Sequence, residues 1–205
     1  MAVALLAAAP GISAGQSYDV LLKAVNDGDT KTVGELLNKG LDPESTDKEG
    51  NSLLMIAAQQ GHIDLVTLLI ERDVKVNRQS PHGDTALMMA SLKGHLPIVK
   101  LLVSNGAKIS QSGWAPIHYA AFEGRAEVVK YLLEKGADKN SLAPNGYSAL
   151  MLAARGSHVE ATRMLLYVDA DMTVKGPKGE TALEIAKERK AVEVEALLKR
   201  AGATE

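Results

Sequence analysis

Apolar residues recur along this chain in two alternating patterns. In the first, an apolar run with an alanine pair stops shortly before a glycine, as residues 53–58 do before Gly61. In the second, a Leu-Leu pair such as Leu68-Leu69 lies within a stretch that begins just after that glycine. Runs of this length with these stops predict pairs of short helices, with second helices expected over 63–71, 96–104 and 126–135.

The two patterns return at an almost constant distance. The residue that opens each copy lies at positions 19, 52, 85, 115, 148 and 181, which gives steps of 33, 33, 30, 33 and 33 residues. A fixed period in the thirties is typical of a stacked solenoid. We therefore expect an all-α repeat solenoid of six units, near 17–49, 50–82, 83–112, 113–145, 146–178 and 179–203, within a repeat domain over 17–205. A solenoid favours binding over catalysis.

Capping residues mark where the first helix of each unit begins. Thr85, Ser148 and Thr181 stand at the matching position, where a hydroxyl can accept a hydrogen bond from the first turn. Pro116 follows the same position in the fourth unit and can occupy the first helical turn without losing a hydrogen bond.

Composition limits the kinds of partner. The hydrophobic share of 46% is enough for a continuous core, but only 3% of residues are aromatic, so alanine and leucine fill it. The net charge of −2 predicts no nucleic-acid partner, because a basic face is what such a partner requires. The absence of cysteine excludes disulfides, thiolate metal sites and cysteine nucleophiles.

The first sixteen residues differ from the rest. They are apolar and uncharged up to Pro10, and a small residue, Ala14, offers a cleavage point. This favours an export signal, although no Lys or Arg precedes Lys23. The alternative is an N-terminal helix that caps the first repeat. The segment is too short to cross a membrane, so we expect no membrane insertion.

The repeated phrase resembles the ankyrin repeat motif, Thr-Pro-Leu-His-x-Ala-Ala-x-x-Gly-His. The fourth unit matches it as APIHYAAFEG over residues 115–124, and the resemblance extends over about 17–203. It implies a helix–turn–helix and a β-hairpin or loop in each unit. It also implies that the motif histidine, His118, binds a neighbouring loop; methionine or glutamate replaces it elsewhere, at Met55, Met88, Met151 and Glu184.

The resemblance further implies a concave partner-binding surface, which we call the inner face. It consists of the tips of the loops between units and the exposed end of each first helix. Its residues in this chain are Asn26, Asp27, Lys48, Glu49, Asn51, Gln59, Gln60, Pro81, His82, Asp84, Leu92, Lys93, Trp114, Phe122, Glu123, Pro144, Asn145, Tyr147, Arg155, Pro177, Lys178, Glu180, Glu188 and Arg189.

One loop of the inner face is truncated. Eight residues separate Ala107 from Ala115, whereas eleven separate Ala137 from Ser148. Aromatic side chains beside a gap are typical of interface hot spots. We expect a notch that receives a protruding segment of another protein; the alternative is that Trp114 folds over the gap. The candidate partner-binding residues are Trp114, Tyr147, Phe122, Leu92, His82, Lys93, Glu123, Arg155, Gln59 and Gln60. The junction at the truncated loop is also expected to couple its neighbours weakly.

Catalytic motifs are absent from the sequence. There is no phosphate-binding loop, no Gly-x-Ser-x-Gly elbow and no His-Glu-x-x-His. We expect no enzyme activity, no cofactor and no metal site, and a monomer. The resemblance to small exported ankyrin-repeat proteins of Gram-negative bacteria implies a periplasmic protein partner. That partner would be a hydrolase of the envelope that the chain inhibits, or an oxidative-stress enzyme that it assists. A cytosolic scaffold or effector adaptor is the alternative.

Overall fold

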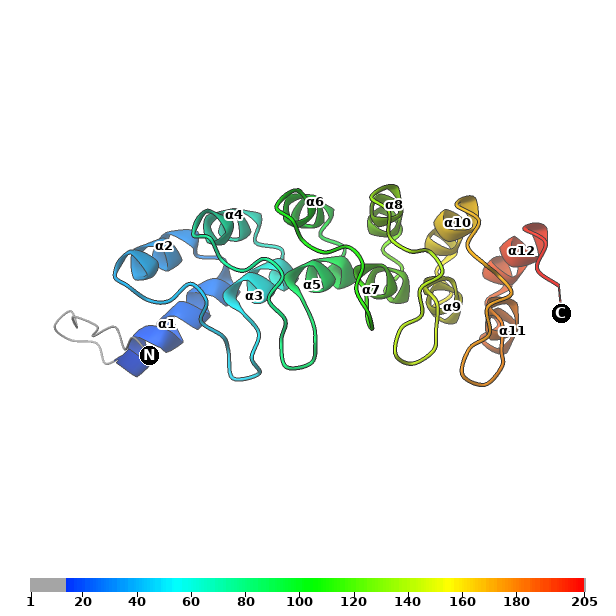
Figure 1. Cartoon of the computed structure of the whole chain (residues 1–205), viewed down its shortest axis with the longest axis horizontal. Coiled ribbons are helices and arrows are strands. Elements are labelled where there is room, and N and C mark those ends of the chain that lie inside the picture. Colours follow the sequence, from blue (N-terminus) through cyan, green and yellow to red (C-terminus); the bar gives the residue numbers. More distant parts are fainter. Residues whose placement is uncertain (1–13, 205) are drawn as a thin grey trace.

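The computed structural model describes residues 14–204, and twelve helices lie within that range (Figure 1). Residues 1–13 of the segment 1–16, predicted to be an export signal or a capping helix, lie outside the described residues. The helices form six pairs: α1 (Ala14–Asp27) and α2 (Thr30–Asn38), α3 (Leu53–Gln60) and α4 (Ile63–Glu71), α5 (Ala86–Lys93) and α6 (Leu96–Ser104), α7 (Pro116–Phe122) and α8 (Ala126–Glu134), α9 (Ala149–Arg155) and α10 (Val159–Tyr167), α11 (Ala182–Glu188) and α12 (Val192–Arg200).

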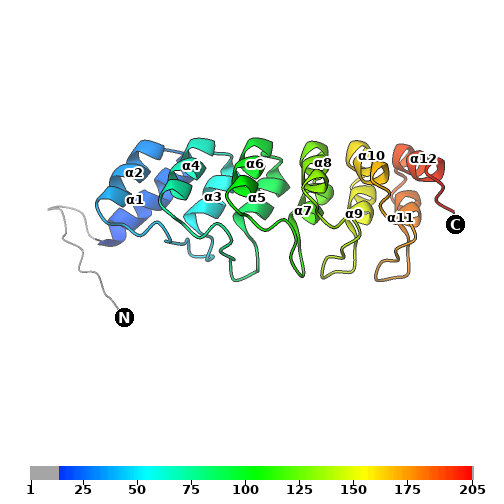
Figure 2. The same ribbon diagram turned by 45° about the horizontal axis from the view of Figure 1, so that its top comes forward.

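The pairs stack into an elongated array with two rows of helices. Figures 1 and 2 show the first helices of all pairs in one row and the second helices in the other. The loops that join one pair to the next, which we call fingers, project beside the first-helix row. The all-α repeat solenoid predicted from the periodicity is confirmed.

The second helices predicted over 63–71 and 96–104 have these bounds, whereas the one predicted over 126–135 ends one residue earlier, at Glu134. The first helices begin at their predicted caps. The side chain of Thr85 accepts a hydrogen bond from the amide of Met88 (3.3 Å), and Ser52, Ser148 and Thr181 cap their helices in the same way. Pro116 occupies the first turn of α7. Gly61 and Gly94 cap the C-terminal ends of α3 and α5 in the left-handed conformation. These local interactions set the helices after α1 to about two turns, with 7–9 residues each.

The two rows are buried to different degrees. Residues 53–58 of α3 are all buried, because this helix is covered by its own partner helix and by the first helices on either side. In α4 only Leu65, Val66 and Leu69 are buried, on a single face. Each large apolar side chain that is buried stabilises the fold by about 1.5–3 kcal/mol. Repeated in every layer, this is the main stabilising contribution to such an array.

Four of the five fingers share one turn. In the first, the amide of Asp47 donates to the carbonyl of Asn51 (2.9 Å) and that of Gly50 donates to Asp47 (3.1 Å). The same two bonds start from Ser80, Ala143 and Gly176 in the other long fingers. The structure shows at most one isolated antiparallel bridge in a finger, at Thr46–Ser52 and at Leu142–Ser148. Among the described residues the fingers are therefore loops and not paired strands, because so short a turn leaves no length for a ladder.

The finger over 107–115 is the exception. Within the described residues it lacks both backbone bonds; instead the Gln111 side chain donates to the carbonyl of Trp114 (3.2 Å). The truncation read from the spacing is therefore a real shortening of the turn.

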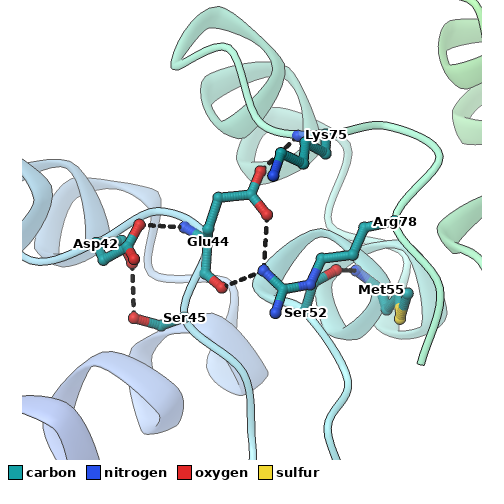
Figure 3. A network of polar contacts seen from close by, with 7 residues as sticks. All are labelled: Asp42, Glu44, Ser45, Ser52, Met55, Lys75 and Arg78. Atoms are coloured by element: carbon teal, nitrogen blue, oxygen red, sulfur yellow. Dashed lines mark hydrogen bonds and ion pairs between the residues drawn. The ribbon is translucent and has the colours of Figure 1, made fainter. Parts of the chain in front are cut away.

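Neighbouring fingers are joined by polar side chains. Figure 3 shows Glu44 accepting from the amide of Lys75 (2.5 Å) and from the guanidinium of Arg78 (2.7 Å), which also binds the Glu44 carbonyl. Burial by itself raises the pKa of Glu44, but the hydrogen bonds from Lys75 and Arg78 outweigh it and hold the pKa below its usual value. Glu44 is thus a charged link between the first two fingers.

Equivalent links recur at the matching position of later units. Asn77 accepts from the amide of Lys108, and Asn140 accepts from that of Asp171, both at 2.8 Å. Ser110 stands at this position in the truncated finger, and among the described residues it makes no such bond. The link is therefore missing between the truncated finger and the next one.

Candidate functional site

A row of residues at the C-terminal ends of the first helices forms the centre of the inner face. Their backbone carbonyls each accept a hydrogen bond from a side chain of the next unit, at 2.8–3.1 Å. The donor and acceptor pairs are His62 and Asn26, His95 and Gln59, Arg125 and Leu92, and His158 and Phe122. We call the acceptors the carbonyl row. Their backbone is fixed across the unit junction, and none of these bonds uses their own side chains.

A glycine makes room for each of these donors. A Cβ on Gly61 would lie 2.8 Å from the ring of His95, and one on Gly124 would lie 2.4 Å from that of His158. The rule changes at the last junction, where Ala191 has no donor side chain and Ser157 replaces the glycine. Ser157 nevertheless keeps the left-handed backbone, with φ of 58°. The donors and glycines are coupled parts of one inter-unit contact.

The predicted site residues at the helix ends present different chemistry in successive units. The apolar part is Phe122, whose side chain is 48% exposed, beside the half-buried Leu92 of the preceding unit. The polar predicted residues here are Gln59 and Gln60 in α3, Lys93 in α5, Glu123 after α7 and Arg155 in α9. All of these except the half-buried Gln59 are exposed.

Trp114 lies at the base of the truncated finger and is partly buried. Its ring meets that of His118 edge-on at 6.1 Å between centroids and tilts over Tyr119 at 5.4 Å. Tyr119 in turn donates its hydroxyl to Asp84 of the preceding finger. The indole thus packs on its own unit, and His82, the other predicted residue near the gap, is exposed on the preceding finger.

Tyr147 lies at the base of the next finger and is held by two neighbours. Its hydroxyl donates to the carboxylate of Glu180 (2.9 Å), which raises the pKa of Tyr147. The guanidinium carbon of Arg155 lies 5.5 Å from the centre of its ring, within the range of a cation–π contact. Tyr147 and Arg155 therefore form one cluster of side chains, whereas Trp114 belongs to a separate cluster with His118 and Tyr119.

His118 is fully buried and joins the truncated finger to the next one. Its Nδ1 accepts from the amide of Ala115 (3.0 Å), and its Nε2 donates to the carbonyl of Ser141 (2.9 Å). The bond to a neighbouring loop that the motif implied is confirmed. Burial lowers the pKa of His118, against smaller opposing effects of the Ser141 carbonyl and the charge of Asp138. The ring is neutral, and it supplies a contact between two fingers that have lost the side-chain link described above.

Comparison with known proteins agrees with this architecture. The sequence model of a family described as ankyrin repeats (3 copies) matches residues 3–80, 21–112, 77–143 and 117–204. The chain belongs to the ankyrin repeat family. Ankyrin repeats generally bind other proteins, so the fold indicates a protein-interaction module.

A solved ankyrin structure is similar over most of the chain. The crystal structure of the human ASB11 ankyrin repeat domain shares 27% sequence identity with it and superimposes with a TM-score of 0.84. The alignment covers 90% of this chain and 84% of that one. No curated protein matches the sequence. The similarity therefore establishes the fold and leaves the partner to be inferred from the surface.

Two further features of the described residues bear on function. Within residues 14–204, no helix is both long and apolar enough to cross a membrane. In the same range, no three acidic or histidine side chains converge on a place where a metal ion could bind.

The donors of the carbonyl row were missed by the sequence analysis. His62, His95, Arg125 and His158 were not among the candidate site residues. The signal that could have revealed them is a glycine one repeat unit before each donor, as Gly61 stands before His95. At the last junction Ser157 replaces the glycine and Ala191 replaces the donor.

Proposed function

We propose that this ankyrin repeat protein is a non-catalytic module that binds a second protein on its inner face and regulates it. The observation that supports this best is Phe122, a large apolar side chain that is half exposed on a backbone fixed by the next unit. Rigid aromatic anchors of this kind provide much of the binding energy in protein interfaces. Titratable side chains elsewhere on this face, such as Glu180, serve as hydrogen-bond partners of neighbouring residues.

The finer proposal concerns the partner and its location. The partner is an enzyme of the bacterial cell envelope, such as a peptidoglycan hydrolase, and the chain inhibits or shields it in the periplasm. The apolar, uncharged segment before Gly11 supports this, because such segments direct export. A chain without cysteine is compatible with an oxidising compartment.

Crosslinked capture of partners from the native cell tests both levels. We expect one enzyme to be recovered with the wild type, lost with Phe122→Ala and retained with Tyr167→Ala. Tyr167 is the matched control, because it is 86% exposed and lies on α10 in the second-helix row. Inhibition of the recovered enzyme by purified chain would establish regulation. A partner retained by Phe122→Ala contradicts inner-face binding, and recovery from the cytosol favours the scaffold alternative.

The notch hypothesis has its own variant. Because the Trp114 ring packs on His118 and Tyr119, Trp114→Ala changes packing as well as any contact with a partner. Thermal unfolding separates the two effects. A protein that melts like wild type and binds its partner undiminished would exclude Trp114 as an anchor and leave Phe122 in that role.

A further inference from the structure

On the inner face between α5 and α11, acidic and basic side chains differ in whether they have a partner within the chain. Three acids there have a partner within the chain: Asp84 and Glu180 accept tyrosine hydroxyls, and Glu123 lies 3.6 Å from the guanidinium of Arg125. A carboxylate held in this way attracts an incoming cation less strongly than a free one, because its lone pairs and part of its charge are already compensated.

Two cations at the same level form no ion pair within the described residues. Lys93, the last residue of α5, is exposed and has no acidic partner within the described residues. Arg155, the last residue of α9, contacts the ring of Tyr147; Glu180 and Glu188 line the same small pocket, but Arg155 forms no ion pair among the described residues. The surface therefore presents two positive charges that form no ion pair within the described residues.

An apolar site lies between these two charges. Leu92 and Phe122 belong to α5 and α7, and α9 follows in the stack. Neighbouring helices pack roughly 8–10 Å apart, so Lys93 and Arg155 are separated by about 20 Å across two layers. An extended chain covers that distance with about six residues.

We propose that the partner presents an extended acidic segment to this part of the inner face. An apolar side chain of the segment covers Phe122 and Leu92, and carboxylates about three residues to either side pair with Lys93 and Arg155. This inference rests on the proposed function and specifies the chemistry of the partner. A purely structural role for both cations would be to offset the negative end of the helix dipole.

Selection from a displayed library of random twelve-residue peptides tests the inference without knowledge of the natural partner. Purified full chain serves as bait, and enriched peptides are synthesised for affinity measurements. We expect peptides with a central aromatic or aliphatic residue flanked by Asp or Glu. Phe122→Ala should weaken their binding about tenfold or more, as for an interface anchor.

Charge variants then isolate the two cations. Lys93→Gln and Arg155→Gln should each weaken binding about two- to fivefold, as for exposed ion pairs, and the double reversal to Glu by more than tenfold. Raising the salt concentration should remove much of the difference between wild type and these variants. Lys130→Glu is the control, because Lys130 lines a separate groove of about 410 Å³ between α8 and α10. That variant should bind like wild type, and unfolding curves verify that every variant is folded.

The outcomes distinguish this inference from the function on which it rests. Peptides that depend on Phe122 but carry no acidic bias, or that bind Lys93→Gln and Arg155→Gln like wild type, overturn the acidic segment and leave inner-face binding intact. Acidic peptides that respond equally to Lys130→Glu show non-specific attraction and also overturn it. If no peptide is enriched, or none depends on Phe122, both the acidic segment and inner-face binding are contradicted.

Discussion

Replacing His118 by methionine should weaken the centre of the array. Methionine is the residue at the same position of three other units, at 55, 88 and 151, so the side chain fits the repeat. The change removes the acceptor for the buried amide of Ala115 and the donor to the carbonyl of Ser141. Packing volume changes little, and the two polar contacts are what the variant tests.

The magnitude follows from those two groups. A buried group left without a partner costs about 1–3 kcal/mol, and an ordinary intramolecular hydrogen bond contributes about 0.5–1.5 kcal/mol. Ala115 is only 3% exposed, so its amide belongs to the first class, whereas Ser141 is half-buried and belongs to the second. We expect the free energy of unfolding to fall by about 2–4 kcal/mol in His118→Met.

A second substitution should recover part of the loss. Ala115 is the only one of the five caps from 52 to 181 that lacks a hydroxyl. Ala115→Thr in the His118→Met background restores the pairing of cap and methionine seen at Thr85 and Met88, whose bond is 3.3 Å long. A restored cap is worth about 1 kcal/mol.

The same residue gives the protein a pH dependence of known sign. Because burial lowers the pKa of His118, the unfolded chain takes up a proton first as the pH falls below about 6.5. Stability from the neutral ring is complete above that pH and is lost as the pH falls toward the folded-state pKa. One proton corresponds to a slope of up to about 1.4 kcal/mol per pH unit.

Urea unfolding of wild type and variant at pH 7.5, 6.5 and 5.5 measures both effects. The wild type should lose stability across this range, and the contribution of His118 to the slope should disappear in His118→Met. The reasoning is refuted if the variant unfolds within about 0.5 kcal/mol of wild type at pH 7.5, or if its slope is the same.

Three further measurements address other parts of the array. Arg78→Gln should lower the free energy of unfolding by about 1 kcal/mol. Because the pKa of Glu44 is depressed in the folded state, its ion pair stabilises the protein above a pH of about 4.5, and this stabilisation is lost as the pH falls below that value. Arg78→Gln should therefore lose less stability than the wild type on acidification. Lys190→Gly should raise stability by about 0.5–1 kcal/mol, since Lys190 has φ of 55°, where a side chain is strained; an unchanged or lowered urea midpoint would contradict this. Amide hydrogen exchange should be faster in 107–115 than in the other fingers, and equal protection there would show that its missing turn bonds are compensated.

The helices could be predicted from the sequence because their determinants are local. A cap such as Thr85 and a stop such as Gly94 act on residues within one turn, and the period repeats the same information in every unit. The predicted second helices over 63–71 and 96–104 accordingly have the same bounds in the structure. The truncated finger was readable for the same reason, since the deficit appears directly as a step of 30 residues.

The candidate site depends on contacts that local pattern does not contain. The bond from His158 to Phe122 spans 36 residues, and nothing in the short-range sequence shows which carbonyl an imidazole will reach. The orientation of Trp114 was left open for a similar reason. Whether an indole beside a shortened loop turns outward or packs inward depends on the rings of His118 and Tyr119, which come together only in the folded unit.

The carbonyl row separates the part of each residue that holds the array together from the part that can bind a partner. In Phe122 the carbonyl accepts from His158, and the side chain is free of that bond. Substitution of the side chain should therefore change affinity without unlocking the unit junction, whereas loss of His158 should loosen the backbone beneath an unchanged side chain. The carbonyl row ends before Arg155, because Ala191 at the matching donor position has no side chain that could donate to the Arg155 carbonyl. The Arg155 side chain is instead ordered by the ring of Tyr147, so the positive charge at this end of the proposed acidic-segment site depends on a finger and not on the next helix pair.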